Sequence, residues 1–111
     1  MPQKKTILLD LDGVLNTYNG KYLSEYIPPL RSGAHQFVKD LSRDYEIKIF
    51  TSRKINLTKQ WLKENNLGKY VAGITKIKEP SWLILDDRCI TFKGDFNSAK
   101  EEIKKFKVWY K

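Results

Sequence analysis

The chain alternates between short apolar runs, typical of buried strands, and longer segments in which apolar residues recur at helical spacing. Strand patterns cover residues 6–11, 46–50, 70–75 and 82–85. Helical spacing covers residues 33–43 and 56–65, and a last helix is expected to open at Ser98, where Glu101 completes a capping box. This alternation predicts an α/β fold in which helices cover both faces of a mostly parallel sheet, in three layers.

Two shorter patterns refine this prediction. Asn19-Gly20 lies between Thr17-Tyr18 and Lys21-Tyr22, and this dipeptide is typical of a type I′ β-hairpin. The hairpin would form a flap directly after the first strand and could close over a ligand. Near the end of the sequence, residues 108–110 are expected to form a short edge strand.

Carboxylates follow two of the expected strands. Asp10 and Asp12, with Gly13 after them, end the first strand, and Asp86-Asp87 follows the fourth. Ligands of α/β proteins bind at the carboxyl ends of strands. Like charges can share a site only if a cation neutralises them or one carboxylate takes up a proton. The pattern therefore predicts a metal site.

Composition limits the architecture and the location. The sequence has 111 residues, of which 41% are apolar and 31% charged, so one domain over residues 1–111 is expected. No apolar stretch approaches membrane-spanning length, and the N-terminal segment lacks the cleavage site of a secretory signal. The cytoplasm is the expected location. Because Cys89 is the single cysteine, no internal disulfide can form.

The net charge of +8 bears on possible partners. A basic surface attracts phosphate-bearing ligands, so nucleotides or nucleic acid are reasonable partners. Many of the lysines, however, alternate with Ile103 and Phe106 in the last helix, where they would form a solvated face. Nucleic acid thus remains an alternative partner rather than the main expectation.

The ordered motifs resemble those of the haloacid dehalogenase (HAD) superfamily. Asp10-Leu11-Asp12-Gly13-Val14 matches its first motif, Thr51 the second, a lysine at 76 or 78 the third, and Asp86-Asp87 the fourth. The resemblance covers the whole chain. It is strongest to small HAD-like proteins of bacteria and phages, and it implies a Rossmannoid core. Relatives insert a cap domain after the first or the second motif. Neither gap in this chain is long enough for a cap domain, so a capless, open site is expected.

The resemblance also implies a role for each catalytic residue. Asp10 would be the nucleophile that forms an aspartyl-phosphate, and Asp12 the general acid and base. Thr51 would donate a hydrogen bond to a phosphate oxygen, and the motif lysine would neutralise charge. Lys78 is favoured over Lys76 because it precedes Glu79-Pro80 just before the fourth strand.

The same resemblance implies a magnesium site. Mg²⁺ would contact Asp10, the backbone carbonyl of Asp12, and Asp86, with Asp87 binding directly or through water. An all-oxygen donor set suits Mg²⁺. Zinc is not expected, because the single histidine, His35, falls in the first helix.

Further side chains near the motifs are candidates for substrate binding. Ser52, Arg53 and Arg88 could bind the phosphorylated substrate, although each arginine could equally form a structural ion pair. Cys89 is expected to be a small filler residue rather than a nucleophile. Tyr18, Tyr22 and Tyr26 could stack on a base or sugar, but packing of the flap is favoured.

The sequence therefore predicts a Mg²⁺-dependent phosphatase that acts through an aspartyl-phosphate on Asp10. Two alternatives remain open. One is a phosphatase that processes polynucleotide ends, which would reconcile the basic charge with the motifs. The other is a catalytically weak module that binds nucleotides or nucleic acid.

Overall fold

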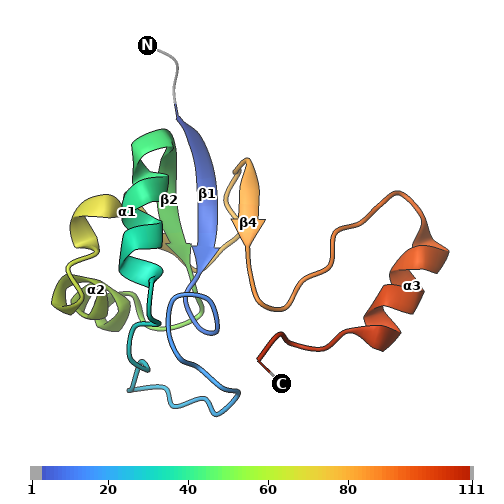
Figure 1. The fold of residues 1–111 in the computed structure, drawn as a ribbon, viewed down its shortest axis with the longest axis horizontal. Coiled ribbons are helices and arrows are strands. Elements are labelled where there is room, and N and C mark those ends of the chain that lie inside the picture. The colour runs from blue at the N-terminus through green and yellow to red at the C-terminus, as the bar shows by residue number, and fades with distance from the viewer. Residues whose placement is uncertain (1–3, 111) are drawn as a thin grey trace.

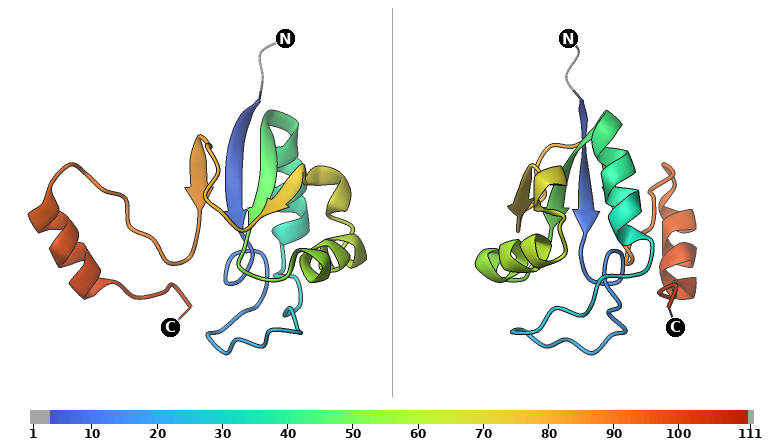
Figure 2. Two further views of the ribbon diagram at one scale, coloured as in Figure 1. Left: turned by 180° about the vertical axis from the view of Figure 1, so that it is seen from behind. Right: turned by 60° about the vertical axis from the view of Figure 1, so that its left-hand side comes forward.

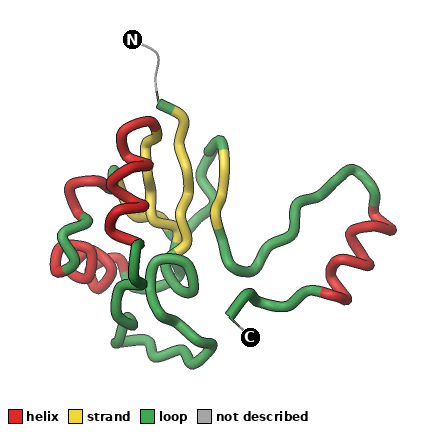
Figure 3. The backbone as a smooth tube through the Cα atoms, viewed as in Figure 1, coloured by secondary structure: helices red, strands yellow, loops and turns green. Residues whose placement is uncertain are grey.

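The computed structural model describes residues 4–110, which form a four-stranded sheet, three α-helices and one 3₁₀ helix (Figures 1 and 3). None of the helices in this range is long and apolar enough to cross a membrane. In chain order the elements are β1 (Lys5–Asp10), α1 (Ala34–Asp44), β2 (Tyr45–Phe50), α2 (Ile55–Glu64), η1 (Gly68–Tyr70), β3 (Gly73–Thr75), β4 (Leu83–Leu85) and α3 (Phe96–Lys105).

All strands of the sheet are parallel and run in the order β3-β2-β1-β4. The predicted α/β class with a parallel sheet is confirmed. β1 is central, with Asp10 beside Phe50 on one neighbour and Leu9 beside Leu85 on the other. The carboxyl ends of β1 and β4 therefore meet at one edge, so the acidic pairs that follow these strands come together.

The core lies between the sheet and the first two helices. Val38 of α1 and Leu62 of α2 join Ile47 and Ile49 of β2 in one buried cluster. The connections from β1 to β2 and from β2 to β3 both move toward the same edge of the sheet. Because such crossovers are right-handed, α1 and α2 lie on the same face of the sheet. Figure 2 (left) shows no helix over the opposite face of β1 and β2.

The expected three-layer arrangement is therefore incomplete over residues 4–110. The connection between β3 and β4 crosses the opposite face, where the Lys48 ammonium lies 2.9 Å from the Glu79 carboxylate. This connection is too short to contain a helix. The remaining helix, α3, stands beyond β4 rather than on the sheet (Figures 1 and 2).

The predicted type I′ hairpin is wrong. A type I′ turn needs positive φ at both central residues, and Asn66 is the only non-glycine with positive φ among residues 4–110, so Asn19 does not meet this condition. The segment after β1 is instead a long loop. Its two ends are joined by an antiparallel bridge between Asn16 and Leu30, next to which the Thr17 amide donates to the Pro29 carbonyl at 3.0 Å.

Three element boundaries also differ from expectation. Tyr70 ends the 3₁₀ helix η1, so the third strand is shorter than predicted and begins at Gly73. Helix α3 begins earlier than Ser98, because the Asp95 carboxylate accepts hydrogen bonds from the Asn97 and Ser98 amides and caps it. Residues 108–110 form no strand, since their side chains dock on the loop after β1.

Candidate active site

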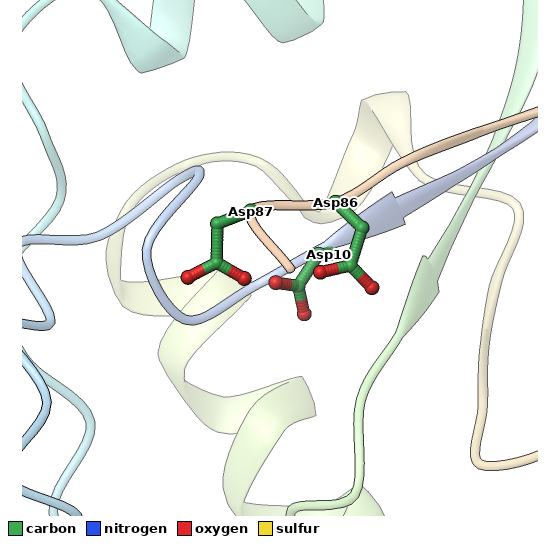
Figure 4. Close-up of side chains that lie close together, drawn as sticks. All are labelled: Asp10, Asp86 and Asp87. Atoms are coloured by element: carbon green, nitrogen blue, oxygen red, sulfur yellow. The ribbon is translucent and has the colours of Figure 1, made fainter. Parts of the chain in front are cut away.

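Three aspartates converge where β1 and β4 end. Asp10 is the last residue of β1, and Asp86 and Asp87 follow β4 directly. Each offers one carboxylate oxygen, and these oxygens lie within 4.8 Å of one another (Figure 4). The cluster opens into a hollow of about 290 Å³ whose lining also includes Asp12, Tyr18, Tyr22, Ser52 and Arg88.

Burial, together with the neighbouring carboxylates, has a large effect on the pKa of Asp10. Burial, the negative charge of Asp86 and the hydrogen bond and charge of Asp87 together raise the pKa of Asp10 from 3.8 to about 9. A hydrogen bond from the Leu11 backbone opposes the shift. Without a cation, the nucleophile expected from the sequence therefore holds a proton at neutral pH.

The donor set fits a hard divalent cation. The cluster consists of carboxylate oxygens alone, which Mg²⁺ prefers, and contains no histidine or cysteine. The raised pKa of Asp10 is the second supporting observation, because burial and the charges of Asp86 and Asp87 keep the proton bound and a cation between these groups would offset both effects. Asp10, Asp86 and Asp87 are therefore the side chains that could hold the ion.

The turn after β1 has room only for glycine at position 13. Gly13 adopts φ +83°, and a Cβ atom there would overlap the Asp87 carboxylate. Both features exclude a larger side chain. The glycine of the first motif thus lets the backbone approach the second acidic pair closely.

The Asp12 side chain lies outside the three-aspartate cluster and is held by two neighbours. Arg53 Nε donates to both Asp12 carboxylate oxygens, at 3.1 and 2.9 Å, and Asn16 Nδ2 donates to Oδ1 at 3.0 Å. The Arg53 side chain is fully buried, whereas that of Asp12 is 19% exposed. The carboxyl group of Asp12 is therefore fixed in orientation.

Arg53 belongs to the segment after β2, and its remaining contacts lie in the loop after β1. Its Nη1 donates to the Leu23 carbonyl at 2.8 Å, and its guanidinium lies 4.7 Å from the ring centroid of Tyr22. Of the two readings of Arg53 from sequence, the structure shows the ion pair. The contact also shows that Tyr22 packs against the body.

The other two residues of this segment, Thr51 and Ser52, differ in exposure. Thr51 is buried, its amide donates to the Thr75 carbonyl at 3.0 Å, and its hydroxyl accepts from the Arg53 amide at 3.2 Å. Ser52 is exposed and lines the hollow. The carboxyl end of β2 thus borders the site, as the motif order predicts.

The two candidate lysines lie in the connection between β3 and β4. Lys76 and Lys78 are both exposed, and neither lines the acidic hollow. Lys76 borders a different hollow, together with Lys54 and Glu25. The choice between the two lysines is thus not made by this geometry, and Lys78 stays a prediction.

Arg88 lies at the rim of the hollow. Its amide donates to Asp86 Oδ1 at 3.0 Å, and its exposed side chain reaches the Tyr110 hydroxyl at 3.5 Å. Tyr110 also makes an edge contact with Tyr18, with ring centroids 6.2 Å apart. Trp109 Nε1 donates to the Gly13 carbonyl at 2.9 Å.

Sequence reasoning did not identify Asn16, Trp109 or Tyr110 as part of this region. Asn16 is fully buried, and its side-chain oxygen accepts from the Gly13 and Tyr18 amides at 3.2 and 3.0 Å. Its position four residues after Asp12 is the only sequence signal for this role. The two aromatic residues gave no such signal, because they lie almost a hundred positions from the motif they contact.

Neither Cys89 nor His35 takes part in the cluster. Cys89 is exposed, and its thiol lies 3.6 Å from the Asp86 carbonyl. His35 lies in α1, where its ring contacts Tyr70 and its Nε2 lies 3.3 Å from the Asn66 carbonyl. His35 thus lies in the first helix, as expected, whereas the interpretation of Cys89 as a filler residue stays a prediction.

A larger hollow, of about 660 Å³, lies between α2 and β3. Its lining includes Ile55, Lys59, Lys63 and Ile74 but none of the motif aspartates. We therefore place the chemistry at the smaller acidic hollow, where titratable groups converge.

Comparison with known proteins gives one match. The family model described as NLI interacting factor-like phosphatase matches residues 5–107, which include every motif residue named above. Searches of curated proteins and of solved structures each found no match.

Proposed function

The chain belongs to the NLI interacting factor-like phosphatase family, a family of HAD-like phosphatases, and from this membership we propose a Mg²⁺-dependent mechanism through an aspartyl-phosphate on Asp10. The observation that carries the proposal is the convergence of the Asp10, Asp86 and Asp87 carboxylates within 4.8 Å at the carboxyl ends of β1 and β4. The substrate is a phosphoric monoester.

In the first step an Asp10 carboxylate oxygen attacks phosphorus, and the bond between phosphorus and the ester oxygen breaks. Asp12 donates a proton to the departing alkoxide, which leaves as the alcohol. Arg53 and Asn16 hold the Asp12 carboxyl group in one orientation for both steps, and the ion pair with Arg53 itself favours the ionised form that the second step needs. A fixed proton donor reduces the entropy cost of the transfer.

In the second step water attacks the phosphorus of the aspartyl-phosphate. Asp12, now ionised, removes a proton from that water, and the acyl phosphate bond breaks to release inorganic phosphate and the Asp10 carboxylate. The two steps in sequence therefore return Asp10 and Asp12 to their starting states. Thr51 and Lys78 are proposed to bind the phosphoryl oxygens, and Ser52 and Arg88 to contact the substrate from the rim.

Asp10 must lose its proton before it can attack. Since burial and the neighbouring Asp86 and Asp87 raise its pKa to about 9, the metal-free site is poorly prepared for catalysis at neutral pH. Mg²⁺ held by Asp10, Asp86, Asp87 and the Asp12 carbonyl would supply positive charge that favours the ionised nucleophile and stabilises the transferring phosphoryl group.

The site is proposed to be open and capless. In the described residues the acidic hollow is bordered by the loop after β1, whose Tyr18 and Tyr22 line it, and by the C-terminal Tyr110 beside Tyr18. An open hollow and a net charge of +8 keep a polynucleotide end as an alternative substrate.

A substrate panel tests the proposal. The purified chain is assayed with Mg²⁺ on p-nitrophenyl phosphate, alkyl phosphates, nucleotides, a phosphopeptide and oligonucleotides with phosphorylated ends. Asp10→Asn is expected to remove hydrolysis of every substrate cleaved, whereas Asp44→Asn, an exposed control at the end of α1, should retain it. Hydrolysis that persists in purified Asp10→Asn would refute the nucleophile assignment.

The same panel tests Asp12 separately. p-Nitrophenol is a good leaving group that needs little protonation, so Asp12→Asn should slow alkyl phosphate hydrolysis by a larger factor. In rapid-quench experiments the wild-type chain should carry one covalently bound phosphoryl group, and Asp10→Asn none. Equal slowing of the first, phosphorylation step for all substrates by Asp12→Asn, measured by rapid quench, would contradict the general-acid role.

A further inference from the structure

The last third of the chain carries many large apolar side chains that are exposed. Among the described residues, none from 76 to 110 is buried. Most of the large exposed hydrophobic side chains lie in this stretch, and their exposed fractions reach 78% at Phe96 and 64% at Ile103. They are Ile77, Trp82, Leu83, Leu85, Ile90, Phe92, Phe96, Ile103, Phe106 and Trp109.

Five of these side chains lie on two faces that do not meet. Phe96, Ala99 and Ile103 follow one another at spacings of three and four residues and form one apolar stripe on α3, which Phe106 extends at the C-cap of the helix. On β4, Leu83 and Leu85 pair with Ile7 and Leu9, so they extend the sheet face that α1 covers. Figures 1 and 2 show α3 held well away from β4.

The segment that contains α3 is attached at both ends. It leaves the body after Asp87, and it returns where Trp109 donates to the Gly13 carbonyl at 2.9 Å and lies 4.5 Å from the Arg31 guanidinium. Within it, Phe92 packs against Phe96, and Lys93 pairs with Glu102 at 2.7 Å. The segment of residues 88–108, here called the arm, thus has contacts of its own that hold it in this extended form.

The extended arm makes the chain larger than a compact monomer. Its radius of gyration is 15.0 Å, against about 13 Å for a compact chain of this length. Its accessible surface is 7794 Å², against about 6,400 Å² for a compact monomer of 13.1 kDa. The excess is about 1,400 Å² per chain.

We propose that a second copy of this chain covers these faces, with the α3 stripe of each copy packed on β4 of the other. Two chains that each bury their excess surface would together bury about 2,800 Å², within the range of about 2,000–5,000 Å² for obligate homodimers. Reciprocal exchange of a helix is a symmetric, closed arrangement. The anchors at Asp87 and Trp109 favour the second copy over the chain's own β4, because they hold α3 beyond the edge of its own sheet.

Light scattering after size exclusion tests the association. The full chain is expected to elute as a dimer at micromolar concentration. Ile103→Glu and Phe96→Glu, each at an exposed position of the stripe, should raise the dissociation constant by about 30-fold or more. Phe37→Glu is the matched control, since Phe37 is exposed on α1 outside both faces, and it should leave the dimer intact. Circular dichroism checks that each variant folds.

Cross-linking tests the exchange itself. In a Cys89→Ser background, one tagged copy carries Leu83→Cys and a differently tagged copy carries Ile103→Cys, and a short bis-maleimide is added to the mixture. The cross-linked product should contain both tags, whereas Phe37→Cys in place of Leu83→Cys should give little product. A monomer at all concentrations, a dimer insensitive to both glutamate variants, or a mixture that yields no cross-linked product with both tags would overturn the proposal.

Discussion

Replacement of Asp10 by asparagine should stabilise the metal-free protein while it removes activity. The pKa of Asp10 is raised from 3.8 to about 9, so between these two pH values the folded chain binds a proton that the unfolded chain has lost. The contribution of this group to stability is therefore greatest below pH 3.8, falls as the pH rises and is lost by about pH 9. Asparagine carries no such proton, and its contribution does not change with pH.

The size of the effect follows from the distance between the ordinary pKa and the working pH. Neutral pH lies a little over three pH units above 3.8, and each unit corresponds to about 1.4 kcal/mol, so the cost of holding the proton is of the order of 4 kcal/mol. For a domain of this length, 1 kcal/mol shifts the melting temperature by about 4 °C. Asp10→Asn should thus melt roughly 15 °C above the wild type at pH 7 in EDTA, and close to it at pH 4.

Thermal unfolding followed by circular dichroism measures this difference across pH 4 to 9. Asp44→Asn is the control, because Asp44 is exposed and lies outside the acidic cluster. Added Mg²⁺ should raise the melting temperature of the wild type more at pH 8 than at pH 5, since the ion competes with the proton. If Asp10→Asn melts at or below the wild-type temperature at pH 7 without metal, burial and the neighbouring charges do not raise the pKa of Asp10 as inferred.

Three further outcomes are expected. Arg53→Met should lower the free energy of unfolding by about 3–5 kcal/mol, because it leaves the partly buried Asp12 without its partner. In urea unfolding, Arg53→Met combined with Asp12→Asn should cost less than the sum of the two single changes. Gly13→Ala should weaken Mg²⁺-dependent activity at least tenfold, because its Cβ displaces Asp87. Gly94→Ala is the control, since Gly94 also has a positive φ but has open space around it, and it should change activity little. Equal effects of the two changes would contradict the crowding at Gly13. EDTA should abolish turnover and Mg²⁺ should restore it. The half-saturating concentration of Mg²⁺ should fall as the pH rises from 6 to 9. A half-saturating concentration that stays constant over this range would argue against Asp10 as a ligand.

Most of the fold could be predicted from the sequence because its elements are local. The apolar run of β1 and the helical spacing of α1 and α2 place these elements within about a residue of their observed bounds. Errors arose where tertiary contacts override local preference. Asn19-Gly20 favours a tight hairpin, but the bridge between Asn16 and Leu30 closes a longer loop instead.

The candidate site was predictable only in part, for the same reason. Motif order and strand ends identified Asp10, Asp86 and Asp87, because parallel topology brings their strands together. The partner of Asp12 was not predictable, since Arg53 could have faced solvent or substrate and burial alone decides between these outcomes.

The sequence by itself determined the α/β class, the order of the motifs and the acidic chemistry at the ends of β1 and β4. Hydrophobic periodicity and motif spacing are properties of neighbouring residues, which is why they can be read along the chain. Only the tertiary structure decided that Arg53 holds Asp12, that Trp109 and Tyr110 reach the loop after β1, and that α3 stands away from the sheet. These features depend on contacts between distant segments and on which surfaces remain exposed, and no local pattern encodes either.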